Sequence, residues 1–180
     1  MSVDYKNIIP ECYVDTNVVT YLMHVRTVNH QYGCGNVANI LLKDFANQFA
    51  IGIIDNDKIK IKYLDECEAI TNSAHLRVLK HRKLPHYIII VGTINRAMDG
   101  FLWDCAEEQS ISPEEFNLPA EFGAFKNYLK KQTSQTDPDI RRLVKAISGN
   151  LELVAFQKLL LYLKDNTYQA KRDDIVRIFE

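Results

Sequence analysis

Phe49-Ala50-Ile51-Gly52-Ile53-Ile54 is an apolar run broken only by a glycine, and it ends abruptly at Asp55-Asn56-Asp57. A strand that is apolar on both faces is typical of the centre of a parallel sheet covered by helices. His86–Val91 has the same character, and Leu76–Leu79 is a shorter strand pattern. Because helical patterns alternate with these strands, the sequence predicts an α/β fold. We expect a parallel, Rossmann-like sheet with helices on both faces.

The segments on either side of this run extend the prediction. Asn7–Ile9 reads as a short strand closed by Pro10, and helices are predicted to begin near Asp15 and Asn36. Further helices are predicted over Leu64–Thr71 and Asn95–Glu108. After Ser110 only helical patterns remain, over residues 113–117, 120–132, 138–147 and 151–164. We therefore expect an α/β domain at residues 1–110 and a helical extension at residues 111–180.

The amino-acid composition excludes some classes of function but does not identify an activity. The 180 residues are 47% hydrophobic and 25% charged, with a net charge of -1, which excludes a globally basic nucleic-acid binder but not a local basic patch. The four cysteines form no Cys-x-x-Cys pair, which disfavours a zinc site built from cysteines and indicates a reducing compartment. The first residues contain no apolar run, and no segment is apolar enough to cross a membrane. We expect a cytoplasmic protein with no membrane contact.

Acidic residues follow two of the predicted strands. Glu11 comes just after the Asn7–Ile9 strand with Asp15 four residues later, and Asp55 and Asp57 end the central strand. If the two strands are neighbours, four carboxylates meet at one edge of the sheet, where their mutual repulsion raises their pKa values. A divalent cation relieves that repulsion, and a cluster of oxygen ligands suits Mg²⁺ or Mn²⁺. Such a site can activate water and stabilise the charge of a phosphoryl displacement.

The order of these acids resembles the Toprim family of metal-dependent nucleases, primases and topoisomerases. The family has Glu-Gly-x-x-Asp after its first strand and Asp-x-Asp after its third, where this chain has Glu11-Cys12-Tyr13-Val14-Asp15 and Asp55-Asn56-Asp57. The resemblance covers roughly residues 5–95 and is greatest to the nuclease branch that includes the overcoming-lysogenization-defect proteins, without their ATPase portion.

The Toprim resemblance implies a role for each acid. Glu11 would act as general acid or base or as a metal ligand, Asp55 and Asp57 would bind the metal, and Asp15 would support a ligand or a second ion. Cys12 stands where the family has glycine, so the backbone there is less open to a phosphate.

A second resemblance uses Asp15 differently. Tyr13–Val19 is similar to the opening of PIN-domain ribonucleases, in which Asp15 would be the first metal ligand at the end of strand one, with Asn17 nearby. The PIN pattern also needs a glutamate in the following helix, and residues 18–43 contain no acid, so this resemblance ranks second. Each acid also has an ordinary structural interpretation: Asp15 as a helix cap, Asp55-Asn56-Asp57 as a turn, and Glu11 as a solvated surface residue.

Basic residues supply candidate phosphate contacts. We predict that nucleic acid is bound by Lys58, Arg77, Lys80, Arg82 and Lys83. A solvated loop explains the same residues without a ligand.

Two functional hypotheses from different classes follow. The first is a metal-dependent nuclease that uses Mg²⁺ or Mn²⁺, with Glu11 as the catalytic residue and Asp55, Asp57 and Asp15 at the metal. The second is a non-catalytic binding module with a degenerate Toprim-like fold, whose helical extension docks a separately encoded protein partner. The sequence leaves open whether the nucleic acid is DNA or RNA, and which oligomeric state the protein adopts.

Overall fold

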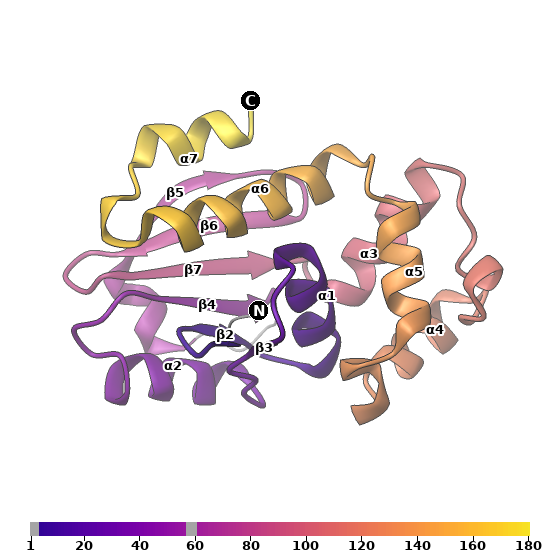
Figure 1. Ribbon diagram of the computed structural model, residues 1–180, viewed down its shortest axis with the longest axis horizontal. Helices are drawn as coiled ribbons and strands as arrows, with labels where there is room; N and C mark the ends of the chain where they lie inside the picture. Colours follow the sequence, from indigo (N-terminus) through magenta and orange to yellow (C-terminus); the bar gives the residue numbers. More distant parts are fainter. Residues whose placement is uncertain (1–3, 57–60) are drawn as a thin grey trace.

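The computed structural model describes residues 4–56 and 61–180 and has an α/β architecture (Figure 1). Its main sheet has five strands in the order β2-β4-β7-β6-β5. A separate parallel pair joins β1 (Asp4–Tyr5) to β3 (Thr27–Val28). The strands of the main sheet are β2 (Ile8–Pro10), β4 (Ala50–Asp55), β5 (Cys67–Asn72), β6 (Leu76–His81) and β7 (His86–Val91). The α/β prediction is confirmed.

Helices cover both faces of the sheet, since alternate residues of β4 and β7 belong to two different apolar clusters. Ile51, Ile53 and Ile89 pack with α1 (Tyr13–Met23), α3 (Met98–Glu108) and α6 (Leu151–Asn166). The residues of β4 and β7 that alternate with these isoleucines point to the other face of the sheet and pack with α2 (Cys34–Lys43). Alternation along a strand sends successive side chains to opposite faces, so two apolar faces require the unbroken apolar runs seen in the sequence.

Gly52 sets how closely α2 approaches the sheet. A Cβ atom at Gly52 would lie 2.8 Å from Cδ1 of Ile88, 3.1 Å from Cγ1 of Val37 and 3.2 Å from Cδ1 of Leu41. These distances are too short for atoms in van der Waals contact, so the missing side chain makes room for two residues of α2. The single interruption in the apolar run is therefore a packing requirement.

The prediction of a wholly parallel sheet needs correction. β2, β4 and β7 are parallel, but β6 runs antiparallel to β7 and β5 antiparallel to β6. The helix predicted over Leu64–Thr71 is also wrong: a 3-10 helix (Lys62–Glu66) leads directly into β5. β5 is an edge strand with several exposed polar side chains, so its sequence lacks the apolar run that marked the other strands.

The described residues from 111 onward contain helices and no strand, as predicted, although α7 (Arg172–Ile178) was not foreseen. α4 (Phe122–Leu129) and α5 (Pro138–Ala146) lie with α3 beyond the arrowheads of β4 and β7 (Figure 1). α6 buries its leucines in the same core cluster as the sheet. Whether residues 111–180 form a separate domain stays a prediction. None of the described helices is long and apolar enough to cross a membrane.

Asn17 fastens α1 to the C-terminal helices. Its side chain is fully buried, and its Nδ2 atom donates to the backbone oxygens of Ser134 at 2.8 Å and Asp137 at 2.9 Å. Its Oδ1 atom accepts from Nε of Arg141 at 2.6 Å. All of these partners come from the segment that includes the start of α5, so Asn17 has a structural role in place of the site role that the PIN resemblance implies.

His75 joins three parts of the fold. It lies buried in the turn between β5 and β6, with Nδ1 2.9 Å from Oε2 of Glu152 on α6 and Nε2 2.9 Å from Oδ2 of Asp104 on α3. Asp104 also pairs with Arg96 at 2.9 Å. Hydrogen bonds to Glu152 and Asp104 outweigh burial and raise the pKa of His75 to about 9. The charged imidazole thus holds α3 and α6 against the end of the sheet.

We expect this network to make stability depend on pH. Because the folded pKa of His75 lies above its unfolded value, its stabilisation is complete below about pH 6.5 and is lost as pH rises through 9. The loss should reach up to about 3 kcal/mol in the free energy of unfolding. Urea denaturation at pH 6, 7.5 and 9 measures it. His75→Gln should flatten the profile, whereas His24→Asn, at an exposed helix end, should keep it. An unchanged slope in His75→Gln would refute the assignment.

Candidate metal centre

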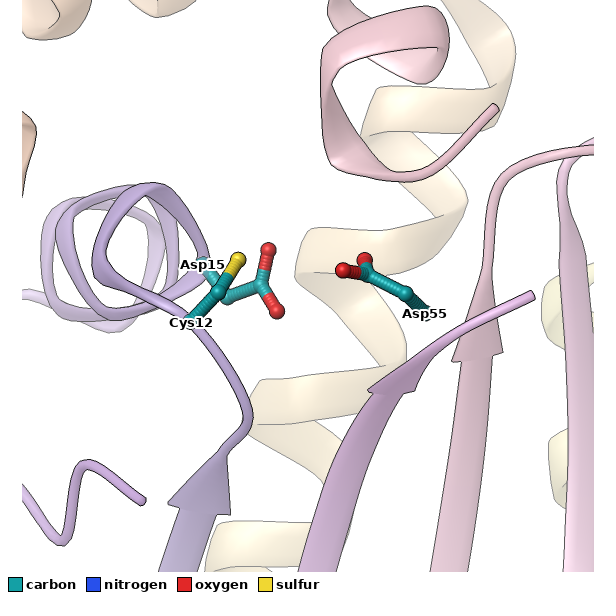
Figure 2. Close-up of side chains that lie close together, drawn as sticks. All are labelled: Cys12, Asp15 and Asp55. Atoms are coloured by element: carbon teal, nitrogen blue, oxygen red, sulfur yellow. The ribbon is translucent and has the colours of Figure 1, made fainter. Parts of the chain in front are cut away.

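Two neighbouring strand ends and the start of a helix bring Cys12, Asp15 and Asp55 together (Figure 2). β2 pairs in parallel with β4, with Pro10 opposite Ile53, so the chain leaves β2 beside the end of β4, where Asp55 is the last residue. α1 begins at Tyr13, which places Cys12 at its N-cap and Asp15 in its first turn. Of the four acids predicted to meet at this edge of the sheet, Asp15 and Asp55 lie close together here, and their role as metal ligands stays a prediction.

Asp15 is the unusual member of the group. Its side chain is 0% exposed, and neither carboxylate oxygen has a hydrogen-bond partner among the described residues. It is not the helix N-cap, because Cys12 occupies that position. A buried carboxylate without partners costs several kcal/mol of folding free energy, and a positively charged ligand would compensate that cost.

The electrostatics of the group agree with that conclusion. Burial, and then the negative charge of Asp55, raise the pKa of Asp15 well above its ordinary value. Burial, Asp15 and Asp55 likewise raise the pKa of the Cys12 thiol. Every shift disfavours the anionic form, which is the expected result when acidic groups share a poorly solvated space. A cation between them would instead stabilise the anionic forms of Asp15 and Cys12 and lower their pKa values.

Glu11 has a different environment from the other acids. It is 9% exposed, and its Oε1 accepts from the backbone N–H of Cys34 at 2.9 Å while its Oε2 accepts from the backbone N–H of Asp55 at 2.9 Å. The interpretation of Glu11 as a solvated surface residue is therefore wrong. Its carboxylate fixes the end of β4 to the start of α2. Glu11 lines the same cavity as Cys12 and Asp55.

The three clustered side chains fit a divalent ion. One ligand atom from each of Cys12, Asp15 and Asp55 lies within 4.8 Å of the others. Metal–oxygen and metal–sulfur bonds are about 2.0–2.4 Å long, so two ligand atoms of one ion lie at most about 4.8 Å apart, and each pair of these atoms meets that limit. Two oxygen ligands suit Mg²⁺ or Mn²⁺, while a thiolate favours a softer transition ion over Mg²⁺.

The remaining predicted residues are distributed as follows. Asp57 and Lys58 lie outside the described residues. Arg77 and Lys80 are on β6, and Arg82 and Lys83 are in the turn that leads to β7. Lys80 pairs with Tyr87 near the start of β7, whereas Asp55 pairs with Val91 at its end. The structure therefore places Lys80, Arg82 and Lys83 at the opposite end of the sheet from the carboxylates, and their binding of nucleic acid stays a prediction.

Sequence reasoning missed other residues at this site. A cavity of about 360 Å³ opens beside Cys12 and Asp55 and is also lined by Asp99, Lys126 and Lys130. Cys12 was treated only as a replacement for glycine, although its spacing of three residues from Asp15 was a usable signal. The two lysines carry the i, i+4 spacing of one helix face, but nothing local links them to residues far earlier in the chain.

Comparisons with known proteins give no information about the function of this site. No family model matches the chain, and searches of curated proteins and of solved structures gave no match. The chemistry of the site must therefore be argued from its own residues.

Asp15→Asn should stabilise the protein in the absence of divalent ions. The neutral amide removes the repulsion with Asp55 and can donate a hydrogen bond to it. A gain of about 1–2 kcal/mol corresponds to a rise in Tm of roughly 2–8 °C, measured by thermal melting in EDTA. Asp44→Asn, an exposed acid after α2, should leave Tm unchanged. A lower Tm for Asp15→Asn would contradict the account.

Cys12→Ser tests whether the thiol is a ligand. Mn²⁺ binds sulfur better than Mg²⁺ does, so the substitution should weaken Mn²⁺ binding by about tenfold and change Mg²⁺ binding much less. Isothermal titration with each ion measures both affinities. Cys67→Ser, which replaces a buried thiol on β5, is the matched control. Equal effects on both ions, or none on either, would exclude sulfur from the ligand set.

Proposed function

We propose that the protein binds a divalent cation, Mg²⁺ or Mn²⁺, at Asp15, Asp55 and Cys12 and cleaves phosphodiester bonds of nucleic acid. The observation that carries the proposal is the fully buried Asp15 carboxylate, whose oxygens have no hydrogen-bond partner among the described residues and which lies beside Asp55. A bound cation would compensate the energetic cost of burying this carboxylate. The adjoining cavity gives a substrate access to that position.

Each residue has a definite part in this proposal. Asp15 and Asp55 hold the ion, and Cys12 adds a softer ligand. When bound, the ion supplies Lewis-acid polarisation of a phosphate oxygen and lowers the pKa of water. Glu11, which borders the cavity, positions Asp55 through the backbone and would act as the general base.

A Toprim-like arrangement is part of the same proposal. Its support is the parallel pairing of β2 with β4, which sets Glu11 and Asp55 at adjacent strand ends. The antiparallel β5 and β6 lie on the far side of β7 from this pair. The central position of Asp15 in the cluster agrees with the PIN resemblance, but Asp15 lies inside α1 and not at the end of a strand. We therefore rank the Toprim-like interpretation above the PIN-like one.

One observation favours a second candidate, a non-catalytic binding module. Both Glu11 oxygens accept backbone N–H groups, which is a structural use of the residue proposed as catalytic. In this candidate the cation would only stabilise the edge of the sheet, and a nucleic acid or protein would bind without being cleaved.

Metal-dependent cleavage of single-stranded and duplex DNA and of RNA tests the proposal. We expect wild-type protein to cleave at least one substrate with Mn²⁺ or Mg²⁺ and to gain thermal stability from the same ion. Asp55→Ala should abolish the gain and lower the cleavage rate by about 100-fold or more, because it removes a ligand of the ion.

Asp44→Asn is the matched control and should retain both properties. Thermal stabilisation without cleavage would support the binding module. The absence of both stabilisation and cleavage at millimolar metal would overturn the proposal as a whole.

A further inference from the structure

The cavity beside the carboxylates is lined by side chains of both charges. Its acidic lining residues are Glu11, Asp55 and Asp99, and its lysines are Lys126 and Lys130 from the region of α4. The same two lysines also border an adjoining hollow of about 200 Å³ next to Asp55. α4 lies beyond the carboxyl ends of the parallel strands (Figure 1), so the helical segment reaches the place where ligands bind in open α/β sheets.

Both ammonium groups are available to a ligand. Lys126 and Lys130 are four residues apart, which sets them on one side of the helix. Within the described part of the chain, neither lysine has a carboxylate within 4.0 Å, and Nζ of Lys126 makes a long contact of 3.4 Å with the backbone oxygen of Asn95. Arg96, the other cation of the adjoining hollow, is paired with Asp104.

A phosphate group can contact both kinds of charge at once. Its oxygens can meet a cation held by Asp15 and Asp55, while its remaining charge is balanced by the two lysines that line the same cavity. A neutral ligand would leave the lysines without a counter-charge, and a cationic ligand would be repelled by them. The arrangement therefore selects an anion that also accepts a metal ion.

Aromatic rings at the rim indicate what the phosphate is attached to. Tyr13 and Tyr32 both line the cavity, with ring centroids 6.1 Å apart, and Tyr13 stacks on His30 at 4.8 Å. Tyr32 is 72% exposed, which is unusual for so large an aromatic side chain. An exposed ring next to a phosphate position suits the face of an unpaired base.

We propose that Lys126 and Lys130 bind the backbone phosphate of a single-stranded nucleic acid whose unpaired base stacks on Tyr32. The C-terminal helical segment then contributes the two lysines of the binding site. This inference rests on the proposed function for the identity of the neighbouring ion, but the lysine and tyrosine contacts can be measured without it.

Fluorescence anisotropy with fluorescein-labelled 12-nucleotide single strands of DNA and RNA, in EDTA, tests the proposal. Lys126→Ala/Lys130→Ala should weaken binding of at least one strand by tenfold or more. It should also reduce the slope of log K against log salt by about 0.7, the value for one phosphate contact on a single strand. Lys145→Ala/Lys158→Ala removes the same charge from two exposed lysines elsewhere and should bind as wild type does.

Tyr32→Ala should weaken single-strand binding by about tenfold with the salt slope unchanged, and should leave binding of a 12-base-pair duplex unaffected. Binding by Lys126→Ala/Lys130→Ala within twofold of wild type would overturn the inference, as would equal losses in the two double-lysine variants. An equal loss of duplex binding in Tyr32→Ala would overturn the stacking contact. The rise in Tm on adding metal should persist in Lys126→Ala/Lys130→Ala, because the lysines do not bind the ion. Loss of single-strand binding can therefore be measured separately from loss of the metal site.

Discussion

The buried carboxylate of Asp15, set beside Asp55 with no hydrogen bond to either oxygen among the described residues, is the constraint on which the account of this protein depends. The other acids near it accept backbone hydrogen bonds, as Asp55 does from the N–H of Met98 at 3.4 Å. Glu11 is held by two backbone amides, and Asp99 accepts from the backbone N–H groups of Ala97 and Gly100. Asp15 alone incurs the cost of burial without a partner, and a cation is the simplest compensation.

Two sets of contacts fix the elements that carry Asp55 and Asp15. Parallel pairing of β2 with β4 fixes the strand ends, and the Glu11 carboxylate ties the end of β4 to the start of α2. The C-terminal helices fix α1 from the other side through the three hydrogen bonds of Asn17. Because α6 shares one apolar core with the sheet, the rigidity of the site depends on the whole chain. The same helical segment also supplies the two lysines of the cavity wall.

The sequence predicted those features that depend on local patterns. β4 and β7 are buried on both faces, so their apolar runs identified them, and the abrupt acidic end of β4 placed Asp55 at the edge of the sheet. β5 escaped prediction because an edge strand keeps polar side chains. The isolation of Asp15 was not predictable, since its burial results from contacts of α1 with α3 and with residues near 132–135, far along the chain. For the same reason no local pattern linked Lys126 and Lys130 to the carboxylates.

Diffraction from crystals grown with Mn²⁺, collected at the manganese absorption edge, tests the central claim most directly. The account predicts one anomalous peak between Asp15 and Asp55, about 2.0–2.3 Å from an oxygen of each, with the Cys12 sulfur at a similar bonding distance. A map with no peak at this position, and with both Asp15 oxygens hydrogen-bonded to protein or water, would contradict it.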